Sequence, residues 1–584
     1  MAQHLAAAQK CRNSSGEAAY RKAPAAWLPA FLGALLAALT LGVVPGQVGR
    51  KNQPLIQDWS NKHLIFTAGK SPVSILSPTI DPRLWNTWLE RNLVLFQPVR
   101  TPPRLSPIPG RKPQPKFKTD WAVPLNSSSG VDPGTFPAKF TFDVGLPPSC
   151  TADFVVFPIN ANASNQANIV AFNQLYRGPD NTGMCQTPPG STPNTMWAYQ
   201  VGSGGVRTSP VLSYPDADQV AFVESQGNAS VFHVLTWKSG EGSITSPKIP
   251  GANGSQAVLR SVRYDNWGSA PAATNTRSSP FVDYGENAAY VGADNGYLYK
   301  IKPVFGLGTP QVVASRLVTS SPATLTGAVR DPLTGLVFVS DGQYVKAYDS
   351  NLASKGQLFV SYSSTGIADP PILDVTNHFV YVFSNNNPGH GKAVTVQVPY
   401  SAPPSVFGTA VFAEIGGQIG TPIRSGAFDN GYYGAPGSGA LYVCGNQGPS
   451  PGSSSLPALY KFTFQSITGT MNPAPALKNI NISPWGGECS PLTEFFNVND
   501  RLFLSHSGVQ QVQMWELPVV SESGNKKASY EVANGTCGII VDNISAEAQA
   551  SSIYFSTRDQ SSGKCMVSGW SKVCAVKLTQ AGLQ

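Results

Sequence analysis

Few residues in this sequence are suited to acid–base or metal chemistry. The 584 residues include six histidines, which are spread along the chain: His4, His63, His233, His378, His390 and His506. No HExxH zinc motif, P-loop or GxSxG nucleophile elbow occurs. Five aspartates fall at predicted turns instead, where a carboxylate accepts hydrogen bonds from backbone N–H groups. We therefore predict no catalytic residue, no metal site and no bound cofactor.

Aromatic residues near two long inserts favour binding over catalysis. Trp237 and Trp267 lie beside the insert 238–278, and Tyr432 and Tyr433 lie near the insert 443–457. The candidate ligand-binding residues are Trp237, Trp267, Tyr432, Tyr433 and His390, the last in the loop NNNPGHGK. Aromatic rings on loops offer flat apolar surface to a glycan or a protein, and packing inside the fold is the alternative for each ring. We predict that both inserts extend from one face of the molecule.

The cysteines predict disulfides and an oxidising compartment. Seven of the eight follow residue 46, and none forms a CxxC pair or a CxxCH haem site. The candidate pairs are Cys150 with Cys185, Cys444 with Cys489, and Cys565 with Cys574. This arrangement leaves Cys537 unassigned, and spacing alone does not decide the connectivity.

The first 46 residues predict a targeting element. Four basic residues precede the uncharged run AAWLPAFLGALLAALTLGVV, Ala25 to Val44. Twenty mostly apolar residues reach across a bilayer as a helix, so both a cleaved signal peptide and a retained signal anchor stay open. Either case predicts that the rest of the chain is exported, to the periplasm, the cell surface or the medium.

Residues 47–136 predict a linker. DPRLWNTWLERNLVLF, residues 81–96, has the pattern of a short amphipathic helix. RTPPRLSPIPGRKPQPKFK, residues 100–118, contains six prolines and six basic residues, which is typical of an extended, semi-rigid spacer.

Composition and repetition predict an all-β fold for residues 137–584. The chain contains 56 Gly and 50 Pro, and charged residues make up only 13%, a balance that favours short strands and tight turns. Units begin with a small residue or Asp before a proline, and the aligned prolines are Pro210, Pro280, Pro322, Pro371, Pro422 and Pro491. Their spacing suits four-stranded blades. Two weaker units, from Cys150 and from Gly538, give one β-propeller of seven or eight blades, and Lys139 to Val144 are expected to supply the outermost strand of the last blade.

One repeat carries a family resemblance. AYVGADNGYLYKI, Ala289 to Ile301, resembles the blades of quinoprotein-like (PQQ-type) propellers, and the resemblance covers roughly residues 137 to 580. That class includes quinone-dependent dehydrogenases and non-enzymatic envelope assembly proteins. The vicinal cysteine pair associated with quinone binding in many of those dehydrogenases is absent from this sequence.

The function predicted from the sequence is binding. The formal net charge of +8 is mild for this length, so we expect no nucleic-acid partner. We predict an exported propeller, tethered to a membrane if the apolar run is uncleaved, that acts as a binding or scaffold module for a protein, glycan or envelope component. The alternative is a quinoprotein-type dehydrogenase or carbohydrate-active enzyme with its site on a propeller face.

Overall fold

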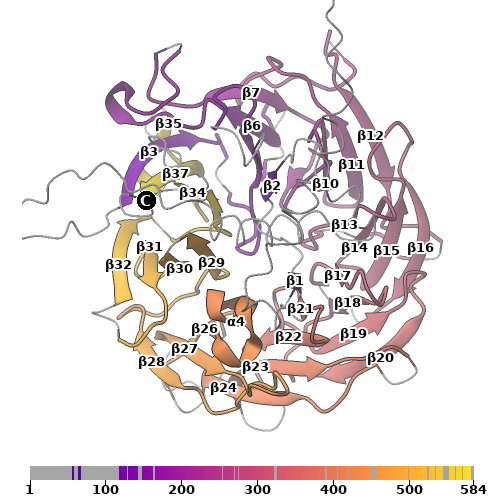
Figure 1. The fold of residues 1–584 in the computed structure, drawn as a ribbon. Coiled ribbons are helices and arrows are strands. Elements are labelled where there is room, and N and C mark those ends of the chain that lie inside the picture. Colours follow the sequence, from indigo (N-terminus) through magenta and orange to yellow (C-terminus); the bar gives the residue numbers. More distant parts are fainter. Residues whose placement is uncertain are drawn as a thin grey trace, which may run out of the picture. The chain divides into compact units, whose positions relative to one another are not determined.

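The repeat around residues 289–301 forms the middle of one blade in the computed structural model (Figure 1). Its tight turn contains Gly296 at φ +82°, the left-handed conformation expected for this Asp-Asn-Gly sequence. Alternate residues of a strand point to opposite faces of the blade. Tyr290 and Leu298 therefore pack in one buried cluster, while Ala289 and Ile301 pack in another. Each face of the blade thus packs against a different buried cluster, as expected for a blade that lies between two neighbours.

The structure describes residues 55–57, 64–66 and 117–580, apart from short internal gaps. The gaps are 128, 142–147, 162–164, 188, 253, 269, 274, 321–324, 388–390, 404–405, 418–419, 449–455, 498, 522–524, 533, 543–551, 559–560 and 568–569. The apolar run 25–44, the predicted helix 81–96 and residues 100–116 of the predicted spacer lie outside the described residues. Among the described residues, no helix is long and apolar enough to cross a bilayer.

Eight four-stranded antiparallel blades surround a central axis (Figure 1). The strands of each blade are given from the axis outward. Blade 1 contains β4 (Ala138–Thr141), β5 (Phe154–Pro158), β6 (Ile169–Asn173) and β7 (Asn194–Tyr199). In blade 2, β8 (Gly205–Val206) and β9 (Val211–Leu212) together form the inner strand, and β10 (Gln219–Ser225), β11 (Ser230–Thr236) and β12 (Val258–Arg263) follow. Blades 3 and 4 contain β13 (Phe281–Asp283), β14 (Ala288–Gly292), β15 (Tyr297–Lys302) and β16 (Gln311–Leu317), then β17 (Val329–Arg330), β18 (Val337–Ser340), β19 (Tyr344–Tyr348) and β20 (Ser354–Phe359). Blades 5 and 6 contain β21 (Ile372–Asp374), β22 (Phe379–Ser384), β23 (Lys392–Pro399) and β24 (Val411–Gly417), then β25 (Ala427–Phe428), β26 (Ala440–Asn446), β27 (Pro457–Thr463) and β28 (Leu477–Asn481). Blades 7 and 8 contain β29 (Thr493–Asn497), β30 (Asn499–His506), β31 (Gln511–Glu516) and β32 (Lys526–Glu531), then β33 (Ile540–Asp542), β34 (Ser552–Ser556), β37 (Cys574–Gln580) and β3 (Phe117–Pro124).

The predicted propeller is confirmed, and the number of blades is eight. The two weaker sequence units, which lack the aligned proline, are blades 1 and 8. These two blades meet where the ring closes, and each pairs with a segment that precedes the repeats in the sequence.

The predicted closing strand is wrong. The outer strand of blade 8 is β3, which pairs with β37 in antiparallel register, whereas Ala138–Thr141 form the inner strand of blade 1. Within β3, Trp121 is almost fully buried, which anchors the strand against the last blade. Closure by this strand covers the edge that blade 8 would otherwise expose.

Two shorter segments of the predicted linker also pair with blades. β1 (Ile56–Gln57) adds to the inner strand β21 of blade 5, and β2 (Leu64–Phe66) adds in parallel to β4 of blade 1. Both lie close to the axis in Figure 1. The propeller therefore includes residues before 137, and residues 47–136 are not a linker throughout.

A buried network of ion pairs fills the seam between blades 8 and 1. Lys139 Nζ lies 2.7 Å from Asp542 Oδ2, and Lys577 Nζ lies 2.5 Å from Asp120 Oδ2. The Tyr176 hydroxyl donates a 2.5 Å hydrogen bond to Asp153. All four charged side chains of the two pairs are at most 1% exposed, and burial raises the pKa of Asp542. We call this group the seam network.

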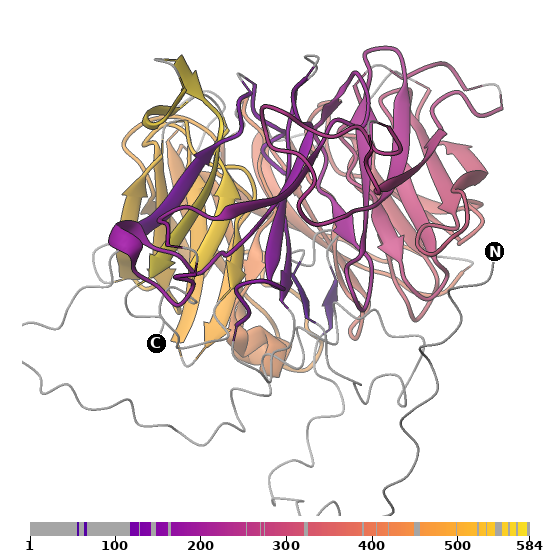
Figure 2. The same cartoon turned by 90° about the horizontal axis from the view of Figure 1, so that it is seen from above.

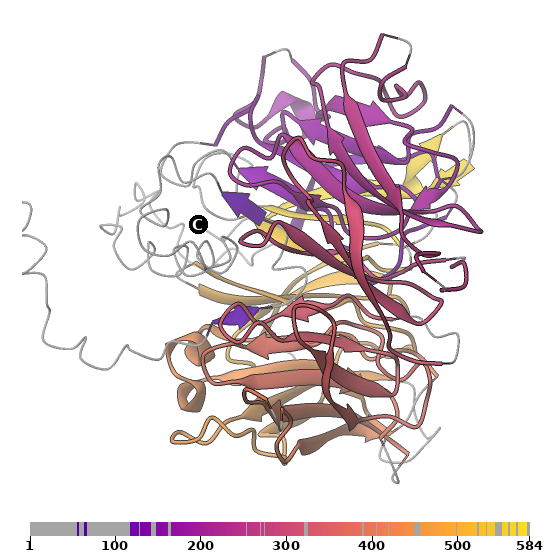
Figure 3. The same ribbon diagram turned by 90° about the vertical axis from the view of Figure 1, so that its right-hand side faces the viewer.

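The propeller has two faces, which we name by their most distinctive elements. The hairpin face contains the hairpin of β35 (Ser561–Val567) and β36 (Trp570–Lys572), together with the loops that lead into each inner strand. The α4 face contains α4 (Asn430–Gly434) and the 3-10 helices η3 (Pro179–Asn181) and η4 (Pro436–Ser438). Figure 2 shows the hairpin at the upper edge and α4 at the lower edge, and Figure 3 shows β1 and β2 on the same side as α4.

Hydrogen bonds between blades explain the small polar residue near three of the aligned prolines. The Ser209 hydroxyl accepts a 2.8 Å bond from the backbone N–H of Phe136, and the Ser279 hydroxyl accepts a 2.9 Å bond from that of Ser209. In blade 5, Asp369 lies two residues before Pro371 and accepts 2.8 and 2.9 Å bonds from the N–H and hydroxyl of Ser425. These three side chains therefore join one blade to the next on the hairpin face.

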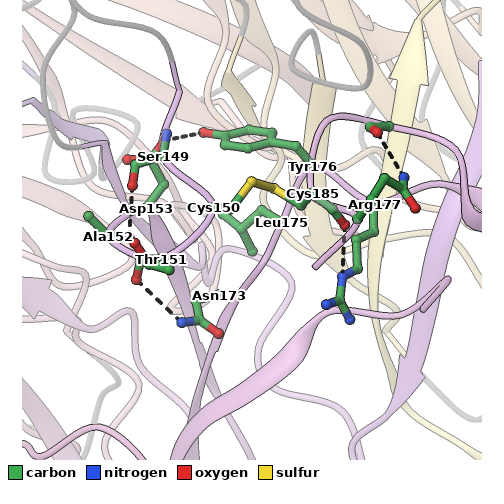
Figure 4. Close-up of a disulfide and its surroundings, with 12 residues drawn as sticks. Ser149, Cys150, Thr151, Ala152, Asp153, Asn173, Leu175, Tyr176, Arg177 and Cys185 are labelled. Carbon is green, nitrogen blue, oxygen red and sulfur yellow. Dashed lines mark hydrogen bonds between the residues drawn. A yellow bond between two sulfur atoms is a disulfide. The ribbon is translucent and has the colours of Figure 1, made fainter. Parts of the chain in front are cut away.

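Two predicted disulfides are confirmed. Cys150 bonds to Cys185 with a Cα–Cα distance of 5.5 Å, and Cys444 bonds to Cys489 at 6.4 Å. Figure 4 shows the first bond beside Leu175 and Tyr176 on the α4 side of blade 1. Cys574 is also disulfide-bonded, while the side chain of Cys565 lies outside the described part, so that pairing stays a prediction.

Candidate functional site

The loops that lead into the inner strands of blades 2, 3, 5, 6 and 7 bring charged side chains together on the hairpin face. Asp132 comes from the segment 125–137 that precedes β4, and Arg558 lies between β34 and the β35–β36 hairpin of blade 8. The members of this axial cluster are Asp132, Arg207, Arg277, Asp369, Arg424, Glu488 and Arg558.

Arg424 forms the buried core of the axial cluster. Its Nη1 lies 2.6 Å from Asp369 Oδ1, and its Nε lies 2.7 Å from Glu488 Oε1. Burial opposes its charge, but the two carboxylates hold the pKa of Arg424 above its usual value. Charge-assisted pairs with this geometry fix the relative positions of blades 5, 6 and 7.

The segment 125–137 crosses the axis beneath these loops. Asp132 Oδ1 lies 3.4 Å from both Arg207 Nη2 and Arg277 Nε. The Thr135 hydroxyl donates a 2.7 Å bond to the Arg207 carbonyl. A Cβ on Gly130 would lie 1.9 Å from the Arg558 carbonyl oxygen, so the close approach requires glycine. The segment therefore occupies the mouth of the axis and contacts several blades.

Three arginines of the cluster still reach solvent. The side chain of Arg277 is 50% exposed, and those of Arg207 and Arg558 are 22% and 21% exposed. Arg558 Nη2 also lies 2.6 Å from Glu488 Oε2, which fixes one side of its guanidinium. A guanidinium fixed on one side by a carboxylate can donate its remaining N–H groups to an acidic group of a ligand.

Exposed aromatic rings lie on the same face as the axial cluster, each three or four residues after the end of an outer strand. Trp267, Tyr362 and Trp485 are 43%, 61% and 66% exposed, and they lie in the loops that lead into blades 3, 5 and 7. Within the described part of the chain, they are the exposed aromatic side chains. The backbone N–H of Trp485 donates a 3.0 Å bond to the Ser483 hydroxyl, and the centroid of the Tyr362 ring lies 5.2 Å from that of Phe359. The first contact fixes the turn that carries Trp485, and the second packs Tyr362 against the outer strand β20.

His506 and Cys537 lie beneath the axial cluster without solvent contact. Burial lowers the pKa of His506 to about 4, and its Nδ1 accepts a 3.2 Å bond from the Val509 N–H. Burial raises the pKa of the free Cys537 thiol to about 12. Both groups are therefore neutral near pH 7.

The sequence-predicted binding residues separate in the structure. Trp267 lies on the hairpin face, whereas Trp237 lies on the α4 face with its ring stacked 6.2 Å from Trp197. Tyr432 is fully buried, and its hydroxyl lies 2.7 Å from Asp374; Tyr433 beside it is half-buried on the α4 face. His390 lies outside the described residues. Packing within the fold therefore accounts for Trp237 and Tyr432, and only Trp267 adjoins the candidate site.

The prediction that both inserts extend from one face is wrong. Residues 238–257 lie on the α4 face, β12 follows, and residues 264–278 lie on the hairpin face. The backbone of the first part pairs with the outer strand of blade 1 through Trp197 and Tyr199, so it covers that edge. Sequence reasoning missed the strand within the insert, and it missed Tyr362 and Trp485 because each stands alone in a short loop.

Comparisons with known proteins add little beyond the fold. No protein-family model matches the chain, and no curated protein matches its sequence. Solved structures with a related architecture include Sqt1 from Chaetomium thermophilum (12% identity, 80% of this chain and 98% of that chain, TM-score 0.44) and Sqt1 from Saccharomyces cerevisiae (9% identity, 80% and 98%, TM-score 0.41). Raptor from Chaetomium thermophilum is 8% identical over 62% of this chain and 26% of that chain, with a TM-score of 0.34. Likenesses at this level say nothing about the ligand of this chain.

Proposed function

We propose that this chain is a non-catalytic binding module that holds a protein partner on its hairpin face. The observation that carries the proposal is that Trp267, Tyr362 and Trp485 are exposed on the same face as the partly exposed arginines of the axial cluster. Trp, Tyr and Arg are the residues that most often dominate protein–protein binding energy. Large exposed rings and partly exposed guanidinium groups on one face match that composition.

The charges indicate the chemistry of the partner. Arg277, Arg207 and Arg558 are the accessible charged groups of the cluster, while Asp369 and Glu488 are buried against Arg424. A partner segment with carboxylates next to apolar side chains would meet the arginines at the centre and the rings at the rim. A neutral glycan offers no carboxylate to the arginines, so a loss of binding when an arginine is replaced by an acidic residue favours an acidic protein segment over a neutral glycan.

Export and tethering complete the proposal. The apolar run 25–44 with its basic flank would direct the chain across a membrane and, if uncleaved, anchor it there. The disulfides Cys150–Cys185 and Cys444–Cys489 support an oxidising compartment. Kinship with quinoprotein-like propellers remains part of the proposal, and the repeat at 289–301 supports it.

Site-specific photo-crosslinking in the native host tests this function. A photoreactive phenylalanine analogue would replace Trp485 or Tyr362 on the hairpin face, and Ile467 or Val520 on the α4 face serve as matched exposed controls. We expect one recurring protein to crosslink from the hairpin-face positions, and Arg277→Glu to abolish that product. Crosslinks of equal pattern from both faces, or none from the hairpin face, contradict the proposal.

A further inference from the structure

The α4 face carries exposed aliphatic side chains at the tips of four separate turns. Leu307, Ile467, Val520 and Leu333 are 97%, 96%, 70% and 63% exposed. They follow β15, β27, β31 and β17, which belong to blades 3, 6, 7 and 4. Single exposed apolar residues are common on protein surfaces, but four tips on one face form a pattern. We call these four residues the aliphatic tips.

Internal hydrogen bonds hold the tips outward. The Gln219 side chain accepts a 2.8 Å bond from the Gly306 N–H next to Leu307, and the Gln397 side chain donates a 2.8 Å bond to the Gly469 carbonyl near Ile467. The Asn525 side chain accepts a 2.8 Å bond from the Val520 N–H itself. These turns are braced by polar side chains of neighbouring elements, so the tips do not fold back onto the blades.

Leu333 is braced in the same way. Its backbone N–H donates a 2.7 Å bond to Asp331 Oδ1, and the Thr334 hydroxyl donates a 2.7 Å bond to Asp331 Oδ2. The Asp331 carboxylate is buried and also accepts a 2.9 Å bond from the Tyr400 hydroxyl. The turn is therefore tied to blade 5 while its leucine points into solvent.

The chain enters the propeller from this same face. The Leu55 N–H donates a 3.0 Å bond to the Thr376 hydroxyl, and the Leu55 carbonyl accepts a 2.9 Å bond from the Val375 N–H. Val375 and Thr376 lie in the loop between β21 and β22, on the α4 face. Leu55 follows Val44, the end of the apolar run, by eleven residues, which span at most about 40 Å when extended. An anchored run would therefore keep the α4 face near the bilayer surface.

We infer that the α4 face seats on a lipid surface, with the aliphatic tips in the interfacial region. This inference deepens the proposed tether and rests on it. Rigid turns that carry one aliphatic side chain each can enter the boundary between headgroups and acyl chains, where apolar surface leaves water. The hairpin face then points away from the membrane, which leaves the axial cluster open to a partner.

Fluorescent labels at single positions test the orientation. The full chain with Cys11→Ser would be reconstituted in vesicles of phosphatidylcholine and phosphatidylglycerol, with an environment-sensitive dye on Leu307→Cys or Ile467→Cys. Control labels would sit on Trp485→Cys at the hairpin face and on Val313→Cys, a 49% exposed position on the outer strand β16. We expect lipid-borne spin labels to quench the dye at both tips and at neither control.

Three outcomes would overturn the inference. One is a dye at 307 and 467 that stays in water in the reconstituted vesicles. Another is an apolar signal at the tips that appears without lipid and rises with protein concentration, because a second copy of the chain would then cover the face. The last applies if the exported chain lacks the apolar run. In that case the inference fails if the tips do not enter added vesicles, or if the double variant Leu307→Ser with Ile467→Ser does not weaken vesicle binding by about tenfold or more. None of these readouts depends on hairpin-face crosslinking, so failure of the partner proposal is distinguishable.

Discussion

The seam network and the axial cluster are both built from paired charges, but they differ in their access to water. In the seam network, Lys139, Asp542, Lys577 and Asp120 are at most 1% exposed. In the axial cluster, Arg424 is buried between two carboxylates while Arg277 is half exposed. A buried pair favours one pairing of strands, because any other pairing would leave a charge buried without its partner. A partly exposed arginine still has N–H groups that can donate hydrogen bonds to a ligand. The buried network therefore closes the ring, and in the proposed function the partly exposed arginines contact the partner.

The strongest test of this contrast is a break in the seam network. Lys139→Met leaves the Asp542 carboxylate buried without its cation, so the free energy of unfolding should fall by about 3–5 kcal/mol. Urea unfolding followed by tryptophan fluorescence measures the change. Asp349→Asn, which removes the partly exposed pair with Lys355, should cost no more than about 1 kcal/mol. Equal losses in the two variants would show that burial does not set the value of these pairs.

The next largest effect comes from pH, through His506 beneath the axial cluster. Its pKa is about 4 in the folded chain because burial disfavours the imidazolium, and the unfolded histidine titrates near its ordinary value of about 6.5. The unfolded state therefore binds more protons between these values, so stability falls as pH drops from about 6.5 toward 4, by up to about 1.4 kcal/mol per unit.

A variant isolates that histidine from the carboxylates that titrate in the same range. The difference in unfolding free energy between the wild-type chain and His506→Gln should shift against the wild type as pH falls below 6.5. A difference that does not change with pH would mean that the imidazole has the same pKa in the folded and the unfolded chain.

Repetition made the fold predictable from the sequence, whereas pairing between distant segments was not. The turn at Gly296 and the aligned prolines repeat in blade after blade, so local chemistry determines them. Strand β3 was missed because it follows a basic, proline-rich stretch, and its pairing is decided by β37 at the other end of the chain. Asp120 and Lys577 become partners only when the ring closes.

The candidate site was harder to predict because no blade contributes more than one of its residues. Arg207, Arg277 and Glu488 each precede an aligned proline by three residues, and Asp369 precedes one by two. Alignment of the repeats contains this signal, but only the closed ring places those positions around one axis. The buried hydroxyl of Tyr432 shows the opposite case, in which a residue type suited to binding is used for packing.

A smaller effect, on binding alone, should follow from Arg277→Glu. The side chain is half exposed, so unfolding should change by no more than about 0.5 kcal/mol. Affinity for the crosslinked partner should fall about tenfold or more, because the guanidinium is replaced by a carboxylate, which repels the carboxylates of an acidic partner. Surface plasmon resonance with the purified partner measures the loss, and Lys355→Glu serves as a distant charge control. Equal losses from both variants would assign the effect to net charge.

The smallest effect concerns Cys537, which reports whether the segment 125–137 stays in the mouth of the axis. The Cys537 thiol donates a weak 3.7 Å bond to the Val131 carbonyl of that segment, and burial raises its pKa to about 12. At pH 8 only about one part in ten thousand of the thiol is the reactive thiolate. Iodoacetamide should therefore leave Cys537 unlabelled in the folded chain that carries Cys11→Ser. Mass spectrometry measures the labelling. Gly130→Ala forces a Cβ into the Arg558 carbonyl and should displace the segment, which makes labelling measurable. Rapid labelling of the chain that retains Gly130 would mean that the segment 125–137 leaves the mouth of the axis without any substitution. Reagents would then reach the inner side of the axial cluster as well as the hairpin face.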